Sequence, residues 1–188
     1  MIEPRTTSGP ELGNLYPPSD HAGLFRRFAI LAIDLGVVLL AFVAIKAVQL
    51  FFQPEDSSRI TRTEFWIWVG FSYAYFVLLE ASALGTLGFF LTGVKIVTLK
   101  GERPSILRMT FRLLLWILGP INAVVDFYWL TGDDCKQTLR DKFAGTLVIR
   151  KDAVPAGVGP IRLNRYHFLG QSFVFYEVVG PAARSVGS

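Results

Sequence analysis

The segment RRFAILAIDLGVVLLAFVAIKAVQLFF, from Arg26 to Phe52, is apolar at almost every position. As an α-helix, residues 28–52 would rise about 37 Å, enough to cross a hydrocarbon core of about 30 Å with some tilt. The apolar region of a signal peptide is only about 7–15 residues long, so we expect a retained membrane helix. Asp34 lies inside this segment, and an acidic side chain at the centre of such a helix costs about 2.5–3.5 kcal/mol.

The composition also favours a membrane protein. Of the 188 residues, 52% are hydrophobic and 18% are charged, whereas a soluble domain has roughly 25% charged residues. The net charge of +4 is spread over the polar segments, so we expect the lipid bilayer as a partner and no nucleic acid. The single cysteine excludes a disulfide and a cysteine-based zinc site within one chain. Because no GxSxG, HExxH or P-loop motif occurs, we expect no enzyme, no cofactor and no metal.

Two further apolar segments predict two more membrane helices. Residues 65–84 are about long enough to span and begin with aromatic residues, as at a membrane interface. Residues 107–130 form the third predicted span. Between these two spans, glycines and a β-branched run argue against a continuous helix, and residues 94–99 predict a short extended stretch. The expected fold is therefore all-α, a three-helix transmembrane bundle with a glycine-rich segment between its second and third helices.

The expected organisation has three parts: a polar cytoplasmic N-terminal segment (residues 1–24), a membrane domain (residues 25–151) and an irregular tail containing Pro and Gly (residues 152–188). Within the tail, residues 166–179 are aromatic but too short to span. An interfacial segment and a short hairpin both stay open for them. Arginines at the start of the first helix predict a cytoplasmic N-terminus by the positive-inside rule.

The third apolar segment has two interpretations. If residues 107–130 span, the basic residues that follow lie outside the cell, against the positive-inside rule. If the chain turns back at Gly119-Pro120 as a re-entrant hairpin, these residues stay in the cytoplasm. In the re-entrant arrangement Asp126 returns near Arg27, whereas in the spanning arrangement it lies within reach of Lys46.

Three ionisable residues are expected to meet at the cytoplasmic end of the bundle. Arg27 and Asp34 are seven residues apart, which is two helical turns on one face. Glu80 lies four residues before the end of the antiparallel second span, which brings it close in depth to Asp34. Two hypotheses stay open for this cluster. The Arg–Asp pair is a structural clamp between helices, or the two carboxyl groups hold a proton or a cation.

Three separated motifs resemble the RDD family of membrane proteins. RFAILAID (residues 27–34) looks like the arginine and aspartate of its first helix, and GTLGFFLTGVKIV (residues 85–97) is similar to its TxGkxxxGxxV segment. KQTLRDKFAGTLVI (residues 136–149) resembles its closing motif, in which an aspartate precedes AGT. Beside Arg27 and Asp34, the residues that match these motifs are Gly85, Thr86, Gly88, Gly93, Asp141, Ala144, Gly145 and Thr146.

The resemblance covers residues 24–151, with Phe89 in place of a lysine and Arg140 in place of a histidine. It implies a bacterial multi-pass protein of the inner membrane, in a family for which cation or proton exchange and small-ligand transport have been suggested. Such transport would require a homo-oligomer, because three helices enclose too little room for a pathway. The alternative is a membrane assembly module without transport, in which the basic segment and the tail bind a partner protein or anionic lipid headgroups.

Overall fold

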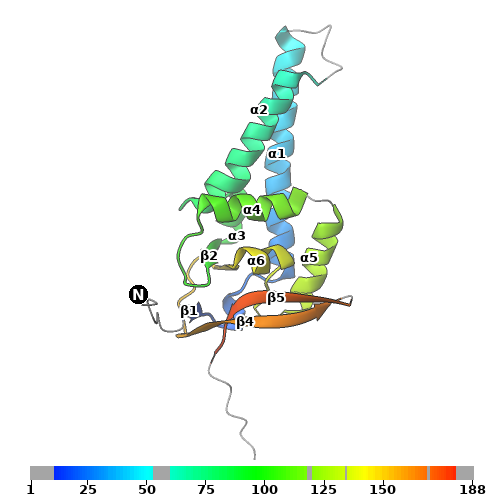
Figure 1. Ribbon diagram of the computed structural model, residues 1–188. Coiled ribbons are helices and arrows are strands. Elements are labelled where there is room, and N and C mark those ends of the chain that lie inside the picture. The colour runs from blue at the N-terminus through cyan, green and yellow to red at the C-terminus, as the bar shows by residue number, and fades with distance from the viewer. Residues whose placement is uncertain (1–10, 53–59, 118–119, 134, 169, 181–188) are drawn as a thin grey trace, which may run out of the picture.

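The structure, a computed structural model, describes residues 11–52, 60–117, 120–133, 135–168 and 170–180. Figure 1 shows a long helical hairpin standing on a compact base. The hairpin consists of α1 (Leu24–Phe52), α2 (Arg62–Tyr73) and the π-helical segment η3 (Ala74–Leu79), which continues α2. The other elements lie in the base. In chain order these are β1 (Leu12–Leu15), η1 (Pro18–Asp20), α3 (Leu87–Thr92), β2 (Val94–Thr98), α4 (Ile106–Ile117), α5 (Pro120–Gly132), α6 (Leu139–Ala144), β3 (Thr146–Arg150), β4 (Gly157–Phe168) and β5 (Gln171–Val178).

The outer surface of the hairpin is apolar. Within the described part of the chain, α1 is the one helix that is long and apolar enough to cross a membrane. Its 29 residues rise about 43 Å, and many of its large apolar side chains, such as Leu40 and Phe51, are exposed. The next helix, α2, begins at a capping box formed by Thr61 and Glu64, and its Trp66 is exposed as well.

Residues 107–130 do not form one helix. α4 ends at Ile117 and α5 begins at Pro120, and Figure 1 shows α4 lying across the foot of the hairpin while α5 runs down toward the β4–β5 sheet. With 12 and 13 residues, both helices are shorter than the roughly 20 residues that a span needs. The predicted third spanning helix is therefore wrong. The turn expected at Gly119 lies outside the described residues.

Two antiparallel sheets complete the base. β2 pairs with β3 from Val94↔Arg150 to Thr98↔Thr146, and the other sheet has the order β1-β4-β5. β1, from the N-terminal segment, thus pairs with β4, from the C-terminal tail; the domain boundaries expected near residues 24 and 151 stay a prediction. Side chains from both sheets meet in one apolar cluster, formed by Val97, Leu99, Leu147 and Ile149 with Ile161 and Val178 against them.

The expected all-α fold with an irregular tail is wrong. The tail forms the β4–β5 hairpin, which was one of the two alternatives for residues 166–179. On β5, Phe175 is buried against Trp129, whereas its neighbours Val174 and Tyr176 are exposed. This alternation is typical of a strand with one covered face. The short extended stretch expected at residues 94–99 is confirmed as β2.

A second apolar cluster joins the hairpin to the base. Its members come from six elements and include Ile30 of α1, Val77 of η3, Phe89 of α3, Ile96 of β2, Met109 of α4 and Val148 of β3. Burying these side chains together fixes the position of the foot of α1 relative to the other five elements. Arg27 and Asp34 lie on the same face of α1 as Ile30, three residues before it and four residues after it. The apolar cluster therefore also positions the charged residues described below.

Candidate functional site

Asp34 is buried where α1 contacts the N-terminus of α3. Its side chain is 2% exposed and accepts three hydrogen bonds. The hydroxyl groups of Tyr75 and Thr86 each donate at 2.7 Å, and the backbone N–H of Gly88 donates at 2.8 Å. These bonds replace the water that a carboxylate loses on burial. Within the described residues Asp34 has neutral donors but no cationic partner.

The spacing of the glycine-rich motif follows from this contact. Thr86 is the N-cap of α3 and its hydroxyl bonds Asp34. A Cβ on Gly88 would lie 2.7 Å from the carbonyl oxygen of Ile30 and 2.8 Å from the carboxyl group of Asp34. Only glycine therefore allows α3 to approach α1 this closely. The two other glycines of the motif have positive φ angles, +70° at Gly85 and +66° at Gly93.

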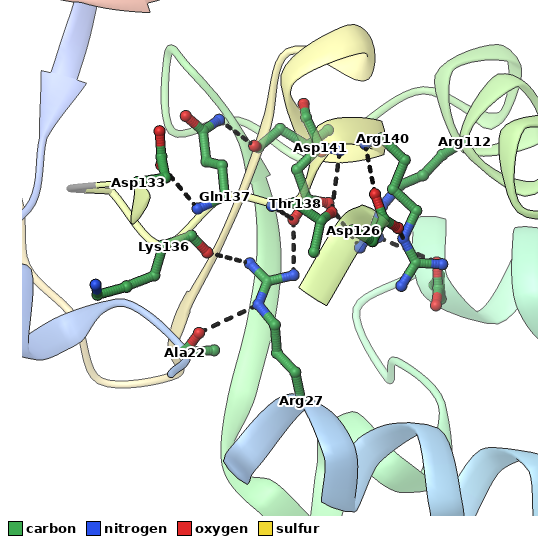
Figure 2. Close-up of polar contacts among 12 residues, drawn as sticks. Ala22, Arg27, Arg112, Asp126, Asp133, Lys136, Gln137, Thr138, Arg140 and Asp141 are labelled. Atoms are coloured by element: carbon green, nitrogen blue, oxygen red, sulfur yellow. Dashed lines mark hydrogen bonds and ion pairs between the residues drawn. The ribbon is translucent and has the colours of Figure 1, made fainter. Parts of the chain in front are cut away.

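Arg27 lies at the centre of a second polar cluster, in the base (Figure 2). Its Nη1 lies 2.6 Å from Oδ2 of Asp141, and its guanidinium group also donates to the carbonyl oxygens of Ala22 and Lys136. Arg27 is 7% exposed and Asp141 is fully buried. The expected ion pair between Arg27 and Asp34 does not form, because seven residues separate them by about 10 Å along the helix. Arg27 points toward α6 instead.

The closing motif builds the short helix that carries Asp141. Thr138 is its N-cap and exchanges hydrogen bonds with Asp141 in a capping box. Gly145 ends the helix with a φ of +59°. Ala144 and Thr146, on either side of it, are buried. The motif residues therefore place a carboxyl group in the interior of the base through local backbone geometry.

Arg112 connects Asp141 to Glu80. Its Nη2 lies 2.8 Å from Oδ1 of Asp141, and its Nη1 lies 3.4 Å from Oε2 of Glu80. Its third nitrogen, Nε, is buried and has no hydrogen-bond partner among the described residues. Beside this chain of contacts, Arg140 pairs with Asp126 at 2.9 Å (Figure 2). Ion pairs thus run from α1 through α6 and α4 to the end of η3.

A cavity of about 70 Å³ lies among these charges. One water needs about 10–15 Å³ of such space, so several waters or a small hydrated ion fit. The apolar part of the wall includes Leu31, Phe76, Leu113, Trp116 and Phe127. The charged residues of the wall are Arg27, Asp34, Glu80, Arg112, Asp126 and Arg140. The three residues of the predicted cluster therefore line one cavity, and their role stays a prediction.

The charges around the cavity do not balance. Three arginines and three carboxyl groups line it, and Asp141, behind Arg27 and Arg112, adds a fourth carboxyl group. With every group ionised, the site carries one net negative charge. Burial alone would raise the pKa of Asp141, but the guanidinium groups of Arg112, Arg27 and Arg140 hold this pKa well below its ordinary value. Asp141 is therefore an anion at neutral pH, and the four carboxyl groups together exceed the three guanidinium groups by one.

The two additional residues considered from the sequence lie far apart. Lys46 is in the outer part of the hairpin, where its Nζ lies 3.7 Å from the carboxylate of Glu64. Asp126 lies at the cavity with Arg27, as in the re-entrant alternative. Within the described ranges, no three His, Cys, Asp or Glu side chains gather as a metal site would require.

Sequence reasoning missed three residues that complete the site. Arg112 had a signal, because an arginine inside an apolar segment needs a buried partner. Arg140 was noticed only as a departure from a family histidine, although it contacts Asp126. Tyr75 belongs to the aromatic group interpreted as an interface belt, yet it is 7% exposed and bonds Asp34. Its role depends on the π-helical turn, which no sequence pattern considered above predicts.

The comparisons with known proteins agree with these motifs. The model of the RDD family matches residues 21–145, about two-thirds of the chain. The matched range contains α1 with Arg27 and Asp34, the turn around Thr86, and all of α6 with Asp141. No curated protein and no solved structure matches the chain.

Proposed function

Since the chain belongs to the RDD family, a family of membrane proteins, we propose that it is a multi-pass protein of the bacterial inner membrane that transports a proton or a monovalent cation. The observation that carries this proposal is the cavity at the foot of the hairpin, where four carboxyl groups meet three guanidinium groups. In this proposal the protein is a transporter and not an enzyme, and it uses no cofactor.

The proposed membrane placement rests on where Asp34 lies along α1. The part of α1 beyond it, residues 35–52, rises about 27 Å, close to the thickness of a hydrocarbon core. α2 and η3 run back beside this part (Figure 1), so the hairpin makes two crossings. Asp34 then lies at the membrane edge, and its contacts with Thr86 and Gly88 keep it away from lipid. Asp34 therefore avoids the free-energy cost of an acidic side chain at the membrane centre.

The distribution of basic residues supports a cytoplasmic base. The connector between the two helices of the hairpin and the start of α2 contain only Arg59 and Arg62 as basic residues. The base contains many more, including Arg26, Lys95, Arg108 and Lys136. Lysine and arginine flanking membrane helices lie predominantly on the cytoplasmic side. The N-terminus and the C-terminal hairpin are then both cytoplasmic.

Glu80 is the group that we propose to take up the transported ion. It lies in the cavity wall, and its contact with Arg112 is long, at 3.4 Å. Asp34, by contrast, is held by three short hydrogen bonds, and Asp141 by two arginines. A carboxyl group with a weak partner can exchange that partner for a proton or a cation. Because two helices enclose no pathway, we propose that several copies assemble as a homo-oligomer.

The proposal is tested by cation flux into proteoliposomes under an imposed pH gradient. The wild type should carry out flux that depends on the gradient, and Glu80→Gln should abolish it. Glu102→Gln is the matched control, because Glu102 is an exposed acid on the turn after β2. Unchanged flux in a correctly inserted Glu80→Gln protein would contradict the proposal.

One observation favours a second function, a membrane assembly module without transport. The residues of the family motifs, Arg27, Asp34 and Asp141, are all bonded to partners inside the chain, as a structural clamp requires. Under this alternative a partner protein binds the outer face of the β4–β5 hairpin. Absence of flux in the wild type, together with a cross-link from the Tyr176→Cys variant to a second protein, would favour this function over transport.

A further inference from the structure

We propose that one side of the base, formed by α3 and the adjoining ends of β2, β3 and α1, binds the headgroups of anionic phospholipids. We name this the α3 face, and its residues are Arg26, Leu87, Phe90, Leu91, Lys95 and Lys151. The inference rests on the proposed membrane placement and is independent of transport. It assigns a specific lipid-binding role to residues outside the cavity.

The position of α3 places this face at the level of the headgroups. Its N-terminus is bonded to Asp34 through Thr86 and Gly88, and Asp34 marks the edge of the proposed span. From there α3 runs along the foot of α1 into the base (Figure 1). A helix at this depth lies in the interfacial region of the bilayer, where apolar and charged groups are both accommodated.

The outward side of α3 is apolar. Leu87, Phe90 and Leu91 are 45%, 61% and 60% exposed, and their spacing puts them on one side of the helix. The opposite side contains Gly88 and Phe89, which are buried. Large apolar side chains exposed beside a membrane helix can be covered by the upper parts of lipid acyl chains.

Two lysines extend over this apolar surface. Nζ of Lys151 lies 5.3 Å from the ring centroid of Phe90, a cation–π arrangement. Nζ of Lys95 donates to the carbonyl oxygen of Lys151 at 3.0 Å, and the backbone N–H of Lys151 bonds the carbonyl oxygen of Gly93 at the end of α3. Both ammonium groups are therefore fixed next to α3. A lysine with its stem on an aromatic ring at a membrane edge presents its charge to the headgroups.

A third basic group lies beside them. Arg26 lines a shallow groove with Phe25 and Thr92, the last residue of α3. In the described part of the chain neither Arg26 nor Lys151 forms an ion pair, whereas the nearby Asp152 pairs with Arg150. The α3 face thus has a positive excess next to exposed apolar side chains. This combination fits an anionic phospholipid better than free phosphate, because phosphate leaves the apolar groups uncovered.

The test compares lipid binding to the full chain in detergent by native mass spectrometry. The protein is titrated with phosphatidylglycerol or with phosphatidylcholine of the same chain length. We expect preferential retention of phosphatidylglycerol, and weaker retention as ionic strength rises. The double variant Arg26→Gln/Lys151→Gln should lower this affinity about thirtyfold, from the typical contribution of two basic residues near an anionic surface.

The matched control removes the same charge elsewhere. Arg162→Gln/Arg165→Gln changes two exposed arginines of β4 and should leave phosphatidylglycerol binding near that of the wild type. Equal affinity of the wild type for both lipids, or an equal loss in both double variants, would overturn the inference. Competition by inorganic phosphate at the concentration at which phosphatidylglycerol binds would overturn the assignment to lipid. Since binding is measured in detergent, these results are independent of the flux assay. If the chain were not a membrane protein, the wild type would be missing from the membrane fraction of cells.

Discussion

Asp34 illustrates how a carboxyl group can lie in an apolar helix without facing lipid. Three donors, from η3 and the α3 turn, satisfy its two oxygens. The donors Thr86 and Gly88 belong to the same short motif, so one turn of chain both docks on α1 and solvates the acid. The carboxyl group in turn fixes the position of α3. The hydrogen bonds of Asp34 and the packing of α3 against α1 therefore depend on each other.

The close approach of α3 to α1 predicts the effect of adding one methyl group. Gly88→Ala should destabilise the chain by about 1–3 kcal/mol, because the new Cβ would overlap the backbone of Ile30 and the carboxyl group of Asp34. Thermal unfolding in detergent measures the effect. In Gly36→Ala, the control in α1, the new Cβ would meet no atom within 4 Å, so stability should be unchanged or slightly higher. Equal destabilisation of the two variants would rule out the tight contact.

Asp141 predicts a defined pH dependence. Burial is outweighed by Arg112, Arg27 and Arg140, which lower the pKa of Asp141 in the folded state. Its stabilising contribution is thus complete above the unfolded pKa of about 3.9 and is lost as pH falls below it. We expect the unfolding temperature of the wild type to fall steeply below about pH 4. Asp141→Asn should lose about 3–5 kcal/mol at neutral pH and fall less steeply in acid.

The control for this prediction is Asp152→Asn. Asp152 forms an exposed ion pair with Arg150, and we expect its loss to change the neutral unfolding temperature little. If Asp141→Asn were as stable as this control at neutral pH, the ion pairs of Asp141 with Arg27 and Arg112 would not be what stabilises the base.

At the scale of elements, α6 connects the cavity to the C-terminal hairpin. Its three consecutive charged residues point to different partners: Arg140 to Asp126, Asp141 to Arg27 and Arg112, and Lys142 to Asp133 and Glu177. Lys142 is 3% exposed, which is rare for a lysine. The β4–β5 hairpin is thus attached to the rest of the base by a partly buried ion pair as well as by aromatic packing.

Removing this attachment should loosen the hairpin selectively. Lys142→Gln leaves two carboxylates without their cation, and we expect the hairpin to lose about 3–5 kcal/mol of local stability. Hydrogen exchange of the β5 amides should accelerate, while exchange in α1 stays slow. Lys100→Gln is the control, since Lys100 pairs with Glu11 on the surface. Unchanged exchange in β5 would contradict the proposed attachment.

The elements also show how far the sequence predicts the structure. α1 was predictable because its apolar run is long, and β2 because a β-branched run follows Gly93. A break of residues 107–130 at Gly119-Pro120 was one of two alternatives, and the sequence did not decide between them, since apolar composition suits a span and an amphipathic helix alike. On α4, Leu107 is exposed, whereas Arg112 is buried and lines the cavity. A short hairpin was one of two alternatives for residues 166–179, which the sequence did not distinguish from an interfacial segment, and the start of β4 at Gly157 was not predicted.

The candidate site could be predicted from the sequence only in part. Arg27, Asp34 and Glu80 were found because charged residues are conspicuous in apolar helices, and all three line the cavity. Their partners were not, because pairs such as Arg27 with Asp141 join residues 114 positions apart. Spacing along one helix suggested Asp34 as the partner of Arg27, but tertiary packing supplied a closer carboxylate. Long-range pairing is set by the fold and leaves no local pattern.

At the scale of the whole molecule, the proposed function depends on one membrane arrangement. In this proposed arrangement the apolar hairpin crosses the membrane twice, and the base, with both sheets and both ends of the described chain, lies on one side (Figure 1). A third span would place α6 and its motif on the opposite side from the N-terminal segment, although β1 and β4 are paired. The pairing of β1 with β4 therefore requires that the N-terminal segment and the C-terminal hairpin lie on the same side of the membrane.

The most direct test of this arrangement is the accessibility of Cys135, the one cysteine of the chain. Cys135 is exposed and lies in the base, just before α6. Intact cells and permeabilised cells are treated with a membrane-impermeant thiol reagent, and labelling of the full chain is compared. We predict labelling only after permeabilisation, because the base faces the cytoplasm. Equal labelling in intact cells would place the base outside and contradict the proposed cytoplasmic orientation.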